Sequence, residues 1–186
     1  GARGLMQLMP ATAARVGVHA GGVARAFLSG VKEASRRVAM AEGCDVVAPQ
    51  VQCCSGALSM NAGRDEEAMR FGRSLIDAFE NEGVDTIIVN AAGCGSHMKD
   101  LKRILANDPQ WAERAAAFSA KVRDVSEFLA ALPPVATRHP VKARVAYHDA
   151  CHLAHMQKIR SAPRQLLRGI PELELVEVPD GDQCCG

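Results

Sequence analysis

The amino-acid sequence contains one segment twice. The stretch RVGVHAGG at positions 15–22 aligns without a gap on RVAYHDAC at positions 144–151. In each half a proline then precedes a cysteine by five residues, at Cys54 and at Cys184, and the distances from the aligned segments to these cysteines agree to within one residue. Such self-similarity predicts two copies of one structural unit, the second of them shorter.

Short apolar stretches alternate with segments of helical periodicity along the chain. The sequence predicts strands at 15–19, 45–49, 85–90, 144–148 and 173–179. It predicts a helix that ends at Gly43 and carries one apolar face, a second helix from about Asp65 to Gly83, and further helices over 97–131. The apolar face of the first helix consists of Phe27, Val31, Ala34, Val38 and Ala41. This alternation is typical of an α/β fold built from two tandem βαβ-type repeats with parallel sheets, the second repeat truncated.

The domain organisation follows from the repeat and from proline placement. We expect an N-terminal remnant at 1–14, a first repeat at 15–131, a proline-bearing linker at 132–143 and an incomplete second repeat at 144–186. Because the chain starts with a glycine and the second repeat stops early, we expect a piece of a longer protein.

Composition and charge exclude several classes of function. The 186 residues carry a formal net charge of +1, which offers no electrostatic field for a polyanion, so no nucleic-acid partner is expected. No apolar run approaches the roughly 20 residues that a membrane span needs, and no signal peptide opens the chain. We therefore expect a cytoplasmic protein, in which clustered thiols serve metal, redox or catalytic chemistry.

Most of the seven cysteines follow predicted strands. In parallel α/β sheets, ligands bind beyond the carboxyl ends of the strands, where loops and helix N-termini converge. The cysteines that follow a strand, and that we predict to be metal ligands, are Cys54, Cys94, Cys151, Cys184 and Cys185. Cys44 precedes its strand, so we interpret it as a structural residue.

Several thiolates at one edge indicate a soft metal, either zinc or an iron–sulfur cluster. Structural zinc usually uses closely spaced cysteine pairs, whereas here single or adjacent cysteines are far apart in sequence, which favours a larger cluster. Two adjacent cysteines reach one cluster only if the backbone turns sharply, and the glycine that follows each pair supplies that freedom.

The motifs DACHLAHMQK, NAAGCGSHMKD, GALSMNAG and the final DQCCG resemble the cysteine-rich CCG repeat region of the glycolate oxidase iron–sulfur subunit family. This family is related to the B subunit of heterodisulfide reductase and to lactate-utilisation proteins. The resemblance runs from about residue 15 to the end. It implies an iron–sulfur cluster of the [4Fe–4S] type and no catalytic residues of the chain's own. It also implies a flavin-containing hydroxy-acid oxidase subunit as partner, a quinone-type electron acceptor, and peripheral association with the inner face of the membrane through the complex.

The family pattern in each repeat is a cysteine after the first strand, an adjacent cysteine pair after the second and a Gly-Cys after the third. The second repeat matches as far as it extends, with Cys151, Cys184 and Cys185. In the first repeat Gly22 stands in place of the first cysteine, and Ser55 stands beside Cys54 where a second one is expected, with Cys53 one position early. We therefore expect no complete four-thiolate site in the first repeat. Because the second repeat also lacks its last ligand, we expect the chain as it stands to hold no cluster.

Three other interpretations stay open. One is a thiol or disulfide redox module like heterodisulfide reductase, and another is a zinc-stabilised binding module. The third is remote: GARGLMQLMPATA at 1–13 resembles a lytic transglycosylase motif, but the catalytic glutamate that those enzymes carry upstream of it is missing. We interpret the histidines around Cys151, which are His148, His152 and His155, as solvated or capping residues, and Asp149 as a helix N-cap.

Overall fold

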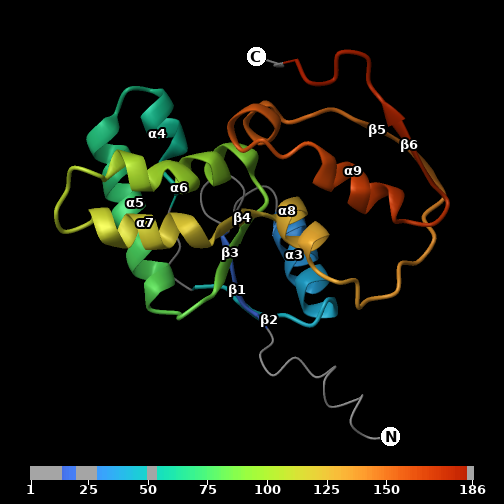
Figure 1. The fold of residues 1–186 in the computed structure, drawn as a ribbon, viewed down its shortest axis with the longest axis horizontal. Coiled ribbons are helices and arrows are strands. Elements are labelled where there is room, and N and C mark those ends of the chain that lie inside the picture. The colour runs from blue at the N-terminus through green and yellow to red at the C-terminus, as the bar shows by residue number, and fades with distance from the viewer. Residues whose placement is uncertain (1–13, 20–28, 50–53, 184–186) are drawn as a thin grey trace, which may run out of the picture.

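The fold is described by a computed structural model, which covers residues 14–19, 29–49 and 54–183 (Figure 1). Helices and strands alternate along the chain, which confirms the predicted α/β fold with parallel sheets. The strands are β1 (Arg15–His19), β2 (Asp45–Val47), β3 (Thr86–Val89), β4 (Val122–Asp124), β5 (Ala143–Tyr147) and β6 (Leu173–Glu177). The helices are α3 (Ser29–Ala41), α4 (Ala57–Asn61), α5 (Asp65–Glu80), α6 (Ala92–Ile104), α7 (Ala112–Lys121), α8 (Val125–Ala131), the π-helix η1 (His152–Met156) and α9 (Ser161–Arg168).

The strands form two parallel sheets. The first has the order β2-β1-β3-β4, and Val16 of β1 pairs with Val46 of β2 on one side and Thr86 of β3 on the other. The second sheet consists of β5 and β6, with Val145 opposite Leu175. Because every pair is parallel, the carboxyl ends of the strands in each sheet lie along one edge.

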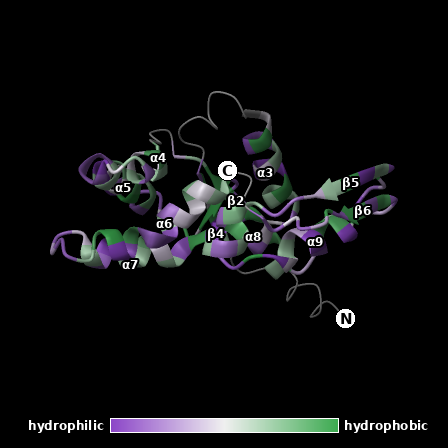
Figure 2. Ribbon diagram, turned by 90° about the horizontal axis from the view of Figure 1, so that it is seen from above, coloured by the Kyte–Doolittle hydropathy of each residue, from purple (hydrophilic) through white to green (hydrophobic). Residues whose placement is uncertain are grey.

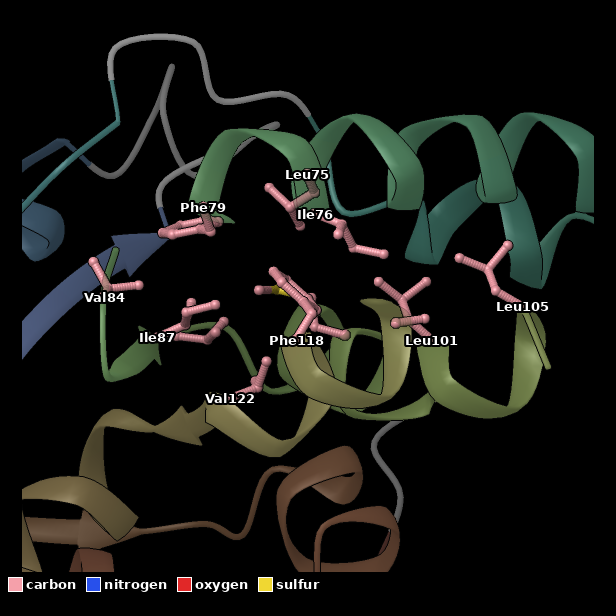
Figure 3. Close-up of a cluster of buried hydrophobic side chains, with 12 residues drawn as sticks. Leu75, Ile76, Phe79, Val84, Ile87, Leu101, Leu105, Phe118 and Val122 are labelled. Atoms are coloured by element: carbon pink, nitrogen blue, oxygen red, sulfur yellow. The ribbon is translucent and has the colours of Figure 1, made fainter. Parts of the chain in front are cut away.

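Helices cover both faces of the first sheet. One core joins α5, α6 and α7 to the sheet through buried side chains that include Phe79, Leu101 and Phe118 (Figure 3). A second core on the opposite face joins α3 and α8 to it, with Ala39 and Phe128 buried. Seen from above, β5, β6 and α9 lie on the side of α3 and α8, away from α5 and α7 (Figure 2). The chain thus forms a larger unit around the first sheet and a smaller one around the second.

The stretch 97–131 was predicted to be helical, and this is wrong at one place. Residues Val122–Asp124 form β4, which pairs with β3 through Ile87 and Val122. Only three residues long and containing Arg123 and Asp124, β4 has too little apolar pattern to stand out between two helical segments. Val122 is fully buried, so the fold recruits this short stretch as the edge of the sheet.

The apolar face predicted for the first helix is wrong, because its four described members, Val31, Ala34, Val38 and Ala41, are all exposed. Val31 and Val38 of α3 are 47% and 41% exposed, whereas Ala39 is 1% exposed and packs on Val16 and Ile88. A small side chain at position 39 lets the helix approach the sheet closely, which the periodicity of larger residues does not reveal. Phe27, at the start of that predicted face, lies outside the described residues.

The predicted linker has no helix or strand over residues 132–142. It is hydrogen-bonded to the first unit through Glu42, which directly follows α3. The Glu42 carboxylate is 1% exposed, accepts hydrogen bonds from the backbone N–H groups of Val135 and Ala136, and forms an ion pair with Arg138. Burial would raise the pKa of Glu42, but the hydrogen bonds from Val135, Arg138 and Ala136 hold this pKa below its usual value. The division of the chain into domains at these boundaries stays a prediction.

Replacing Glu42 with glutamine should lower the free energy of unfolding at pH 7 by about 1 to 2 kcal/mol, because the charge-assisted bonds are lost. The folded-state pKa of Glu42 lies below the unfolded-state value. The stabilisation is therefore complete above the unfolded-state pKa and is lost as the pH falls through the folded-state pKa. Urea unfolding of both proteins between pH 7 and pH 3 measures this.

The matched control is Glu174→Gln, which removes an exposed glutamate paired with Arg144. Exposed pairs contribute little, so its unfolding free energy should stay close to that of the wild type. Equal effects of the two substitutions at pH 7 would contradict the proposed anchoring role of Glu42.

None of the helices in the described part of the chain has the length and apolar character needed to cross a membrane. The transglycosylase-like motif at 1–13 lies outside the described residues.

Candidate metal centre

Three of the predicted ligands lie after carboxyl ends of parallel strands. Cys54 follows β2, Cys94 lies in the first turn of α6 after β3, and Cys151 lies after β5, directly before η1. All three side chains are half-buried. Cys44 lies at the opposite, amino end of β2, where it packs against the core as predicted, and burial raises the pKa of its thiol. The predicted ligands Cys184 and Cys185, together with Cys53 and Gly22, lie outside the described residues.

The chain turns sharply after Cys54, as the glycine in this stretch predicted. Gly56 has a φ of 90° and precedes α4, and its N–H donates to the Cys54 sulfur at 3.5 Å. Ser55 between them is buried, and its hydroxyl accepts a hydrogen bond from the N–H of Ala57. The turn places the backbone of Gly56 against α5, so that an added Cβ would lie 2.8 Å from the carbonyl oxygen of Ala68.

Cys94 lies where a helix N-terminus and the core meet. The N-cap residue of α6, Ala91, offers no side-chain hydrogen bond to the first-turn N–H groups, so this end of α6 keeps its partial positive charge. The Cys94 side chain packs against the core below the sheet edge. A thiolate or an anionic cluster at this position would be favoured by the helix dipole.

The second unit lies directly on the start of α6. The amide of Gln157, just after η1, donates to the carbonyl oxygen of Ala92 at 2.9 Å. Gly95 of α6 lies beneath it, since an added Cβ there would be 3.1 Å from the Gln157 nitrogen. The elements that carry Cys94 and Cys151 are therefore in contact. Gln157 could not be recognised from the sequence, because a lone glutamine carries no pattern that marks it.

Within the second unit, the loop that carries Cys151 is bonded to the turn that precedes Cys184. The N–H of Asp149 donates to the carbonyl oxygen of Gly181 at 2.8 Å. Farther along, the ring of His155 is 2.7 Å from the carbonyl oxygen of Asp182. The chain thus brings residues on both sides of Cys151 to within hydrogen-bonding distance of residues two and three positions before Cys184.

The side chains around Cys151 differ in part from the prediction. His148 is exposed, as expected, but His152 is half-buried with its Nδ1 atom 3.4 Å from the Cys151 sulfur. Asp149 is not a helix N-cap: its side chain is 5% exposed and pairs with Arg164. Hydrogen bonds from Arg164 hold the pKa of Asp149 below its usual value. The carboxylate is thus a fixed, charged support next to the predicted ligand.

His19 ends β1 at the same edge of the first sheet. It is 3% exposed, and neither ring nitrogen has a hydrogen-bond partner within the described part of the chain. Burial, assisted by the positive charge of Lys32, lowers the pKa of His19 to about 4, so its imidazole is neutral at pH 7. Among the described residues, the His19 imidazole therefore has hydrogen-bonding capacity that no partner uses.

A cavity of about 190 Å³ lies between α4, α6 and η1. Ser96, two residues after Cys94, and His152, directly after Cys151, line it. Its walls include Met60, Ser96, His97, His152 and Met156, and therefore come from both units. His97 is 8% exposed, and its Nε2 atom has no partner in the ranges that the structure describes. Burial lowers the pKa of His97 against the opposing charge of Asp100.

The donor set at this edge fits a soft metal or an iron–sulfur cluster: half-buried thiols, a helix N-terminus and a neutral buried imidazole, all at carboxyl ends of strands. Among the residues that the structure describes, no three histidine, cysteine or acidic side chains are gathered closely enough to hold a metal ion. The assignment of Cys54, Cys94, Cys151, Cys184 and Cys185 as ligands therefore stays a prediction.

Comparison with known proteins shows that the chain is similar to proteins with a cysteine-rich domain. The family model for the cysteine-rich domain CCG matches residues 16–99, which lie in the larger unit, and residues 145–186, most of which lie in the smaller one. The chain is 39% identical over 148 residues to the "Probable glycolate oxidase iron-sulfur subunit" of Bacillus subtilis (strain 168), covering 77% of this chain and 33% of that protein. It is 29% identical over 145 residues to "Lactate utilization protein A" of Geobacillus sp. (strain WCH70), covering 77% of this chain and 60% of that protein. The chain thus spans between one third and three fifths of the length of these relatives.

Proposed function

The chain belongs to the family of the cysteine-rich CCG domain, and from this we propose that it is the cluster-binding part of an iron–sulfur subunit in a complex that oxidises glycolate or lactate. In this proposal a flavin-containing partner oxidises the hydroxy acid, and this chain carries the electrons onward to a quinone-type acceptor. The complex would work in the cytoplasm, at the inner face of the membrane, with no role for nucleic acid.

The observation that supports this proposal best is the bonding of the Cys151 loop to the turn before Cys184. It favours Cys151, Cys184 and Cys185 as ligands of one cluster in the second unit. Cys54 and Cys94 follow strands of the first unit in the same way and are proposed as ligands there. When bound, a [4Fe–4S] cluster would supply one-electron redox chemistry at this edge.

The residues of the chain would position and shield this group rather than react. The half-buried thiols would hold it, the N-terminus of α6 would stabilise its negative charge, and His152 would contact the sulfur of Cys151. Neutral imidazoles at His19 and His97 would add hydrogen bonds without adding charge. No acid–base step by this chain is required, because the flavin partner carries the substrate chemistry.

Substrate-driven reduction tests the function. The intact protein is purified anaerobically together with its flavin partner, and visible absorption is followed after glycolate or lactate is added. We expect the visible absorption of the cluster to bleach as fast as the flavin partner turns over the hydroxy acid. Addition of an acceptor quinone should then restore this absorption. A cluster that dithionite bleaches but neither hydroxy acid does would contradict the proposal.

The cavity between α4, α6 and η1 favours a second candidate function, the reduction of a thiol or disulfide substrate at the cluster. Its walls combine methionines and histidines with the charged side chains of Asp100 and Arg103, and they include Gly93 and His152, the neighbours of Cys94 and Cys151. A disulfide-reduction assay with the dithionite-reduced protein separates the two functions. Turnover of a low-molecular-weight disulfide, together with no response to hydroxy acids, would favour this second function over the first.

A further inference from the structure

Two arginines one helical turn apart connect the loops of the second unit. Arg164 of α9 donates from Nη1 and Nη2 to the two carboxylate oxygens of Asp149, each at 2.8 Å, and from Nε to Glu177 at 3.0 Å. Asp149 lies after β5, and Glu177 is the last residue of β6. One guanidinium thus joins the two strand ends from which the chain continues to Cys151 and to Cys184.

Arg160, which precedes α9, makes a second set of contacts. Its Nη1 atom donates to the Asp182 carboxylate at 3.0 Å, and its Nη2 atom is 3.2 Å from the ring of His155. Its backbone carbonyl accepts a hydrogen bond from Arg164, which links the two arginines. Arg160 therefore joins η1, on one side of Cys151, to the turn that leads to Cys184.

The two sets of contacts have the geometry of a rigid support. The Arg164 side chain is 18% exposed, and its guanidinium carbon lies 4.8 Å from the ring centroid of Tyr147. The guanidinium therefore contacts an aromatic ring in addition to the carboxylates that accept its N–H groups. A planar guanidinium with two parallel hydrogen bonds fixes orientation in a way that an ammonium group does not reproduce. By contrast, Arg168 on the same helix is 62% exposed, and its only described partner is Glu177.

We propose that Arg164, assisted by Arg160, is a positioning residue for the metal centre of the second unit. It holds the Cys151 loop and the turn before Cys184 in one arrangement before metal binds. This inference rests on the proposed function for the nature of the metal centre, but the positioning itself does not depend on it. Because ligands held in advance lose less conformational freedom on binding, the clamp formed by these arginines strengthens cluster binding.

The test compares Arg164→Lys and Arg164→Gln with Arg168→Lys and Arg168→Gln in the intact protein. In the metal-free state, hydrogen exchange at the amide of Asp149, which is bonded to Gly181, should become at least about tenfold faster in the Arg164 variants only. In the metal-loaded state, the Arg164 variants should bind iron at least about tenfold more weakly. Any cluster that they retain should show a shifted midpoint potential and an altered EPR spectrum, which the Arg168 variants should not.

The outcomes separate the clamp from the proposed function. Fast exchange in the Arg164 variants, with a wild type that holds no iron, would support the clamp and contradict the function. Arg164 variants that match the wild type in exchange, iron content and EPR spectrum would overturn the clamp. Should both Arg164 variants fail to fold, Arg160→Gln tests the same claim through Asp182, and unchanged exchange and iron content there would overturn it.

Discussion

Replacing Cys151 with serine in the intact protein should lower its affinity for the cluster of the second unit by more than about tenfold, whereas Cys44→Ser should leave iron binding unchanged. Cys151 lies at the carboxyl edge of β5, in the loop bonded to the turn before Cys184. A serine oxygen is a poor ligand for soft iron, so one ligand is lost without a change in side-chain shape. Iron analysis and EPR of the anaerobically purified variants measure the effect.

Cys44 is a matched control because, like Cys151, it is half-buried. It packs against the core at the amino end of β2, which is the edge opposite to the one proposed for the metal. Equal iron loss in the two variants would mean that the substitutions act through general stability. Full iron retention in the Cys151 variant would contradict the assignment of Cys151 as a ligand.

Gly56→Ala should lower the free energy of unfolding by about 2 to 4 kcal/mol, through two separate effects. A φ of 90° is strained for any residue with a Cβ, and the added Cβ would lie 2.8 Å from the carbonyl oxygen of Ala68. Relief of this contact requires a shift of the turn that carries Cys54, whose sulfur accepts from the Gly56 N–H. Urea unfolding gives the stability.

Gly63→Ala separates strain from contact. Gly63 has a φ of 71°, but nothing lies within 4 Å of its added Cβ. Its substitution should therefore cost only the backbone strain, about 1 kcal/mol. Equal destabilisation by the two substitutions would show that the close approach of Gly56 to α5 is unimportant.

Much of the fold was predictable because the relevant signals are periodic or repeated. In the sequence, parallel strands are marked by apolar runs, and the ends of the helices between them are marked by glycines. The duplicated segment identifies β1 and β5 as equivalent strands. The placement of Cys54, Cys94 and Cys151 after strands follows from the same alternation. Cys44 could be assigned a structural role simply because it precedes β2.

The parts that were missed depend on three-dimensional contacts. β4 has only three residues, two of them charged, and becomes a strand because β3 offers it an unpaired edge. The buried face of α3 is set by the small Ala39. The role of Arg164 was hidden because its acidic partners, Asp149 and Glu177, belong to separate strand ends. Its spacing of four residues from Arg160 is the one sequence signal that was available.

Iron, acid-labile sulfide and zinc content of the anaerobically purified intact protein test the central claim most directly, which is that thiols at the carboxyl edges of parallel strands hold an iron–sulfur cluster. We predict iron and sulfide in about equal amounts with little zinc, and a visible absorption band that dithionite bleaches. Zinc without sulfide would contradict this account and would identify the thiols at these carboxyl edges as ligands of a structural zinc ion.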